Sequence, residues 1–204
     1  MKLKEGLSKS VSTDLRTAQV DVTDISTLRP VFQNAHTVIS LVGILHGSTA
    51  AFEAVQWKGA ENVALAAQEV GAKVIHLSAI GADPDSKLIS PRTKGLGEMA
   101  VQKASPTATI IRPSLVFGPG DSFFAVSNRL NHLCMTKSCI MKRFAALSAF
   151  LPCMPVFGGG TSRFQPVYVG DIARLVELCS HTENAEVVKA VEGNILEAGG
   201  PEGE

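Results

Sequence analysis

The sequence predicts an α/β fold: a doubly wound, Rossmann-like parallel sheet that lacks its first βαβ unit, followed by a smaller C-terminal lobe. Short β-branched runs alternate with longer stretches of helical period up to Gly118. The run "HTVISLVGIL" is almost continuously apolar, which is typical of a parallel strand covered on both faces. After Gly118 the alternation stops, so we expect an α/β domain over 1–118 and a smaller irregular lobe over 119–204.

The elements follow one another in the order of such a sheet. "TAQVDV" (17–22) predicts a strand, and Asp24 is a plausible N-cap for a short helix over 24–35. The apolar run over 36–45 predicts the second strand, and a long helix over 50–72 should end at Gly71. The remaining α/β elements are expected as a strand at 73–80, a helix at 92–104 and a strand at 108–118.

Composition narrows the function classes. Apolar residues make up 45% of the 204 and charged residues 19%, which is enough to bury a sizeable core. Lys plus Arg equals Asp plus Glu at 19 each, and this balance without a basic stripe argues against nucleic acid as a partner. The four cysteines form no CxxC pair, which favours reduced thiols, and the longest apolar run is too short to cross a bilayer.

Three successive strand ends carry residues suited to a ligand. Asp21 and Val22 end the first predicted strand, "SLVG" (40–43) ends the second, and Ser78 ends the third. Ligands of doubly wound folds bind at the carboxyl ends of the strands. A glycine there lets a ligand approach the backbone, and an aspartate can accept a hydrogen bond from an amino group such as that of adenine. The alternatives are that Asp21 is a turn residue and that Gly43 only accommodates packing.

Lys94 stands near the start of the third predicted helix, where its ammonium could bind ribose hydroxyls; the alternative is an ordinary solvated lysine. Ser90 stands four residues earlier, where a catalytic tyrosine would be expected. A serine hydroxyl has a far higher pKa and a shorter reach, so it is no general acid unless a base stands beside it. We therefore predict no catalytic residue. His76 shares the strand face of Ser78 and is expected to be buried.

The motifs together resemble a known family. "TAQVDVTD", "ISLVGIL", "HLSAIGAD", "RTK", "ATIIRPSLVFGPGD" and "RFQPVYVGDIA" are similar to those of atypical short-chain dehydrogenase/reductases. Within that family the chain resembles the nucleotide-binding accessory subunits of mitochondrial respiratory complex I and their bacterial relatives. The combination of "SAIGAD" with "RFQPVYVGDIA" is more specific than either motif alone.

This resemblance implies a protein that binds NADP(H) or NAD(H) as a structural ligand. Residues 1–118 would then be the remainder of a nucleotide-binding domain. The implied partners are other complex I subunits, and the implied place is peripheral to the membrane, on the matrix side of the mitochondrial inner membrane. Carried over by position, the implied contacts are Asp21 and Val22 with the adenine, Leu41, Val42 and Gly43 with the adenosine and ribose, and Ser78, Lys94 and Pro113 with the nicotinamide side.

Two departures from the family pattern stand out. No glycine-rich phosphate turn precedes residue 40, so we expect an N-terminally shortened chain with a bare apolar sheet edge and weak or absent nucleotide binding. We also expect it to be shortened at the C-terminus. The stretch 129–142 is extra; we favour a tolerated insertion or unspliced sequence over a basic amphipathic surface helix. Its His and Cys spacing fits no standard metal site.

Three functions stay open at this point. The leading one is a non-catalytic nucleotide-binding scaffold, and the second is an active extended reductase, epimerase or dehydratase. The third is an NADP-sensing regulator that keeps the fold without catalysis. Tyr168, the only tyrosine, is expected to be structural and to pack between the lobes.

Overall fold

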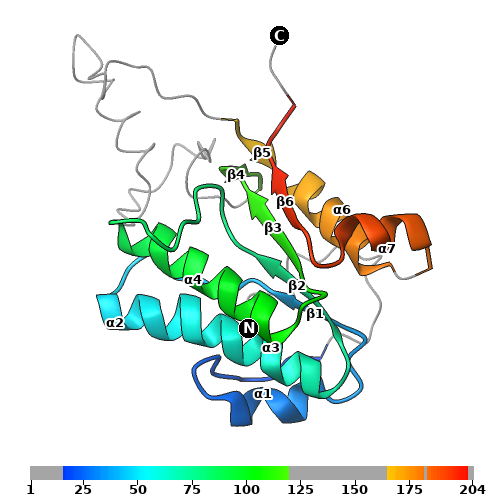
Figure 1. Cartoon of the computed structure of the whole chain (residues 1–204), viewed down its shortest axis with the longest axis horizontal. Coiled ribbons are helices and arrows are strands. Elements are labelled where there is room, and N and C mark those ends of the chain that lie inside the picture. Colours follow the sequence, from blue (N-terminus) through cyan, green and yellow to red (C-terminus); the bar gives the residue numbers. More distant parts are fainter. Residues whose placement is uncertain (1–15, 120–164, 182, 202–204) are drawn as a thin grey trace, which may run out of the picture.

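The computed structural model describes residues 16–119, 165–181 and 183–201, so the extra stretch over 129–142 lies outside the described residues. The main sheet holds β1 (Thr37–Ser40), β2 (Lys73–Leu77), β3 (Thr109–Pro113) and β6 (Ile195–Ala198). These strands are parallel and lie in the order β1-β2-β3-β6 (Figure 1). The predicted α/β fold with a Rossmann-like parallel sheet is confirmed.

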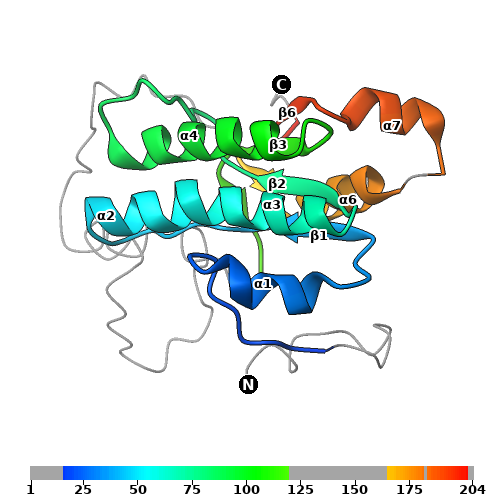
Figure 2. The ribbon, with the colours of Figure 1, turned by 60° about the horizontal axis from the view of Figure 1, so that its bottom comes forward.

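Helices cover both faces of this sheet (Figure 2). One face carries a continuous helical segment made of α2 (Thr49–Phe52), a π-helical stretch (Glu53–Gly59) and α3 (Ala60–Glu69), together with α4 (Ile89–Ala104). The other carries α6 (Val169–Ser180) and α7 (Ala185–Val191). Each face has its own apolar core, because side chains alternate between the two faces along a strand. Val74 faces α3, whereas Ile75 faces α6.

The first predicted helix is confirmed, and α1 spans Ile25–Phe32. Asp24 is its N-cap, and its Oδ1 accepts a hydrogen bond of 2.9 Å from the Ser26 N–H. The second predicted helix also ends as expected, since Gly71 adopts a positive φ of 71° directly after the last turn. α1 packs on α3 through Leu28, which is 1% exposed.

The predicted strand over 17–22 is wrong. Residues 16–21 are exposed and form no ladder hydrogen bonds within the described residues, and the Val22 carbonyl instead accepts a hydrogen bond of 2.9 Å from the Asn62 side chain. A β-branched run forms a strand only where a neighbouring strand pairs with it, and β1 lies on the far side of an apolar groove. Residues 17–22 therefore have the composition of a strand but no adjacent strand to pair with among the described residues.

Four other predicted elements have shifted ends. The strand expected at 36–45 ends at Ser40, and the strand expected at 73–80 ends at Leu77. The strand expected at 108–118 is broken after Pro113, so that β4 (Val116–Phe117) leaves the main sheet and pairs with β5 (Val167–Tyr168). Helix α4 begins at Ile89 instead of residue 92, which places Lys94 in its second turn.

β1 is an edge of the main sheet among the described residues, as the sequence predicts. Ile39 in this strand is 47% exposed, and Leu41 just after it is 71% exposed. The helices in the described ranges include none with the length and apolar character needed to cross a membrane.

Candidate functional site

Lys94 joins the carboxyl ends of β1 and β2. Its Nζ donates hydrogen bonds to the carbonyl oxygens of Val42, at 3.0 Å, and of Leu77, at 3.3 Å. Burial lowers the pKa of Lys94, and the charge of Glu98 acts in the opposite direction. Lys94 is therefore not the solvated lysine of the alternative interpretation, because its ammonium bridges the two strand ends from the adjoining helix.

Ser78 directly follows Leu77, whose carbonyl accepts one of the Lys94 hydrogen bonds. The Ser78 backbone N–H donates a hydrogen bond of 2.7 Å to the Ile111 carbonyl, and the residue is only 6% exposed. Its Oγ is buried without a hydrogen-bond partner among the described residues. The buried residue Pro113 ends the neighbouring strand, and its carbonyl accepts a hydrogen bond of 3.0 Å from the Ile80 N–H. The loop that begins at Ser78 is thus fixed to the end of β3.

A groove of about 400 Å³ runs along the open side of β1. Predicted site residues Val22, Leu41, Val42 and Gly43 all line it, and the rest of its lining is almost wholly apolar. Gly43 is the point where groove and lysine meet, because a Cβ built on this glycine would lie 3.4 Å from Lys94 Nζ. The structure therefore brings together four of the predicted residues in the groove and places Lys94 at its end.

Asp21 has a local role that the sequence alone could not separate from a ligand contact. Its Oδ1 accepts hydrogen bonds from the Thr23 N–H at 2.9 Å and the Thr23 hydroxyl at 2.8 Å. These bonds lower the pKa of the Asp21 carboxyl. Its backbone carbonyl accepts from Asp24 and Thr27, so that the turn leads directly into α1. Asp21 acts here as a turn residue beside the groove.

His76 is buried, as expected. Its Nδ1 lies 3.1 Å from Ser40 Oγ, and its Nε2 has no hydrogen-bond partner within the described part of the chain. Burial, with a smaller effect from the nearby Lys94 charge, lowers the pKa of His76 to about 3. The imidazole is therefore neutral at physiological pH.

Gln56 and Thr93 are polar residues of the site that the sequence reasoning missed. Gln56 is 2% exposed; its Nε2 donates a hydrogen bond of 2.9 Å to the Ile44 carbonyl, and its Oε1 accepts one of 2.9 Å from Thr93 Oγ1. It sits in the π-helical stretch, whose wider turn is frequent at functional sites. The sequence feature that could have indicated this role is the polar side chain of Gln56 on the apolar face of the predicted helix.

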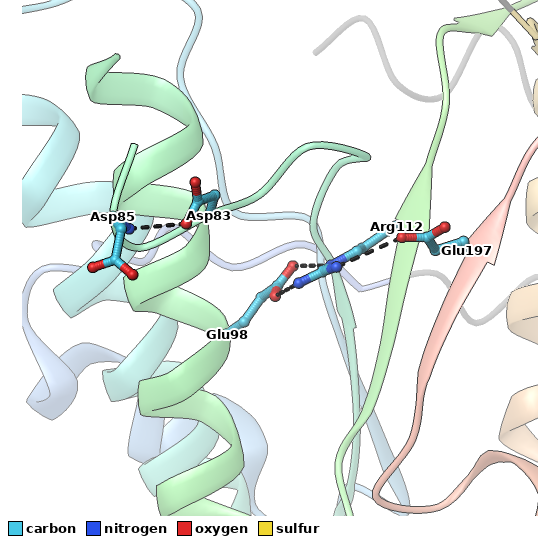
Figure 3. A network of polar contacts seen from close by, with 5 residues as sticks. All are labelled: Asp83, Asp85, Glu98, Arg112 and Glu197. Atoms are coloured by element: carbon cyan, nitrogen blue, oxygen red, sulfur yellow. Dashed lines mark hydrogen bonds and ion pairs between the residues drawn. The ribbon is translucent and has the colours of Figure 1, made fainter. Parts of the chain in front are cut away.

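A charged network lies one helical turn beyond Lys94 (Figure 3). Arg112 of β3 donates to both carboxylate oxygens of Glu98, from Nε at 3.0 Å and from Nη2 at 2.7 Å. Its Nη1 lies 3.6 Å from Glu197 Oε1 on β6. The network joins helix α4 to the two strands beyond β2.

Comparison with known proteins identifies homologues among complex I subunits. The mitochondrial NADH dehydrogenase (ubiquinone) 1 alpha subcomplex subunit 9 of Arabidopsis thaliana is 32% identical over 89% of this chain and 40% of its own length. A ceramide reductase of Caulobacter vibrioides is 32% identical over 72% of this chain and 41% of its own length. The chain thus spans about two fifths of the length of the curated relatives it matches. The resemblance predicted from the motifs is confirmed.

Solved structures agree on the fold. The dTDP-4-dehydrorhamnose reductase of Bacillus anthracis, determined in complex with NADP, superposes with a TM-score of 0.57. It is 19% identical, and the match covers 88% of this chain and 72% of that one. No family model matches the chain.

Proposed function

We propose that these residues are part of an NAD(P)H-binding accessory subunit of mitochondrial complex I, in which the nucleotide is a structural ligand of the full-length protein. The observation that carries the proposal is the Lys94 bridge: an ammonium held beside Gly43 by the carbonyls of Val42 and of Leu77, the residue before Ser78. The choice of complex I as the assembly is supported by the homologues that are complex I subunits.

The contacts in this proposal follow the shape of the site. The apolar groove beside Val22, Leu41 and Val42 would hold the adenosine, with Asp21 at its rim. An ammonium has three N–H donors, and Lys94 uses two of them on carbonyl oxygens. The third donor would bind a ribose hydroxyl.

The nicotinamide side would lie over the next two strand ends. The buried, unpartnered Ser78 hydroxyl supplies one polar contact there, and Pro113 supplies an apolar wall. NADP(H) and NAD(H) share these parts, so the same residues would serve either nucleotide.

The bound nucleotide would not be turned over. Ser90 lies one helical turn before Lys94 in α4, at the place of the expected tyrosine, and a serine hydroxyl is a poor general acid at neutral pH. The chain has no glycine-rich turn before residue 40 to hold the pyrophosphate, so these 204 residues alone would bind nucleotide weakly or not at all. The subunit would lie on the matrix side of the inner membrane, peripheral to it.

An active reductase is the second candidate, and the equal identity to a ceramide reductase favours it. The two functions differ in what happens to NADPH. The protein is purified from its source cells, its bound nucleotide is quantified, and NADPH oxidation is followed by absorbance with a panel of carbonyl substrates. The scaffold proposal predicts bound nucleotide without oxidation; sustained substrate-dependent oxidation would instead establish the reductase.

A further inference from the structure

Lys94 and Glu98 lie on the same face of α4. They are four residues apart, the spacing at which side chains of a helix meet. Glu98 is 3% exposed, so its carboxylate needs a partner, and its charge already acts on Lys94. An ammonium prefers a carboxylate over a neutral carbonyl oxygen. Nothing in the helix itself therefore directs Lys94 to the strand ends.

Arg112 already occupies the carboxylate that would otherwise compete for Lys94. It reaches from β3 toward α4 and binds both oxygens of Glu98 in a fork at 3.0 and 2.7 Å (Figure 3). The carboxylate of Glu197, which is 66% exposed at its side chain, approaches the same guanidinium at 3.6 Å. Arg112 thus draws the buried carboxylate toward β3, whereas Lys94 reaches toward β1 and β2.

We infer that Arg112 is a positioning residue that acts through Glu98: it keeps this carboxylate from pairing with Lys94 and so leaves the ammonium to the strand-end carbonyls and to a ligand hydroxyl. The last part of this inference rests on the proposed function. The first part concerns only the three side chains and stands without a ligand.

Glu98 is the charged group that acts on the pKa of Lys94 among the described residues. His76 of β2 is neutral at physiological pH, and Glu53 of the π-helical stretch lies 3.8 Å from Arg92 in an ion pair of its own. Glu98 is accordingly the carboxylate to which a change at Arg112 would expose Lys94. A freed Glu98 would raise the pKa of Lys94 and lower its free-amine fraction at neutral pH.

The test measures the rate at which acetic anhydride labels Lys94 in the 204-residue chain, by mass spectrometry at neutral pH. In Arg112→Gln we expect labelling to slow about tenfold, the change that one pKa unit produces. Adding Glu98→Gln should restore the parental rate to within about threefold, because the competing charge is gone. Unfolding would end the burial that lowers the pKa of Lys94 and could itself slow labelling, so rates are compared only between proteins that keep the parental cooperative melting transition.

Arg112→Lys is the second variant, for the case in which Arg112→Gln loses its cooperative melting transition. A lysine holds Glu98 through a point charge instead of a fork, so an intermediate slowing of about threefold is expected. Parental labelling in both Arg112 variants, or slow labelling that Glu98→Gln does not reverse, would overturn the inference.

A further labelling experiment distinguishes failure of this inference from failure of the proposed function. The parent protein is isolated from its source cells and freed of its bound nucleotide, and it is then labelled with and without added NADPH. Protection of Lys94 by NADPH supports the nucleotide site. If the variants rank as expected and NADPH gives no protection, the proposed function fails and the role of Arg112 stands.

Discussion

Gln56 offers a direct test of how the site is held together. Gln56→Met keeps the approximate shape of the side chain and removes the hydrogen bonds to the Ile44 carbonyl and from Thr93 Oγ1. A hydrogen bond contributes about 1 kcal/mol net, and a buried group left unpaired costs more, so we expect a loss of about 2–3 kcal/mol in the free energy of unfolding. With a typical urea dependence this moves the unfolding midpoint down by about 1 M.

Urea unfolding of single and double variants isolates the contact. Thr93→Val removes the shared bond, so the two substitutions together should cost about 1 kcal/mol less than their sum. Gln68→Met is the matched control on the exposed end of α3 and should change stability by less than about 0.5 kcal/mol. An unchanged midpoint for Gln56→Met, or exact additivity with Thr93→Val, would refute the bridging role.

The remaining predictions concern other parts of the fold. The buried neutral His76 takes up a proton when the chain unfolds below pH 6.5, so stability should fall by about 1.4 kcal/mol per pH unit between about 6.5 and 3 from this group; His76→Phe should flatten the slope in urea titrations across pH. Gly97→Ala should lower stability by about 1–3 kcal/mol in thermal unfolding, because a Cβ there would overlap the Gln56 carbonyl; a neutral result would contradict this close helix contact. Tyr168→Phe should leave nucleotide affinity of the native protein unchanged, since the ring packs on Phe117 with centroids 5.7 Å apart; a large drop in calorimetric affinity would assign it to the site.

The sequence predicted the elements whose stability is local. The apolar periodicity of the helices and the Asp24 cap needed no knowledge of distant residues, and both are confirmed. The run over 17–22 failed for the opposite reason: its strand propensity was real, but pairing depends on a neighbour that local sequence does not describe.

The sequence indicated which residues to consider for the site, but not the contacts that they make. Strand-end positions led to Gly43 and to Ser78, because parallel strands end at one edge; Lys94 reaches a Cβ position built on Gly43 and the carbonyl of Leu77, the residue before Ser78. The bond from Lys94 to the Val42 carbonyl crosses 52 positions, and no periodic pattern encodes it. Gln56 was missed because its role depends on a π-helical turn that has no clear sequence signature.

Native-gel migration of the endogenous protein, with analysis of the nucleotide it releases on denaturation, tests the central claim most directly. We predict co-migration with NADH:ubiquinone oxidoreductase from respiratory membranes and release of NADP(H) or NAD(H) in near-equal proportion to the subunit. A protein that migrates apart from the complex and releases no nucleotide would contradict the account.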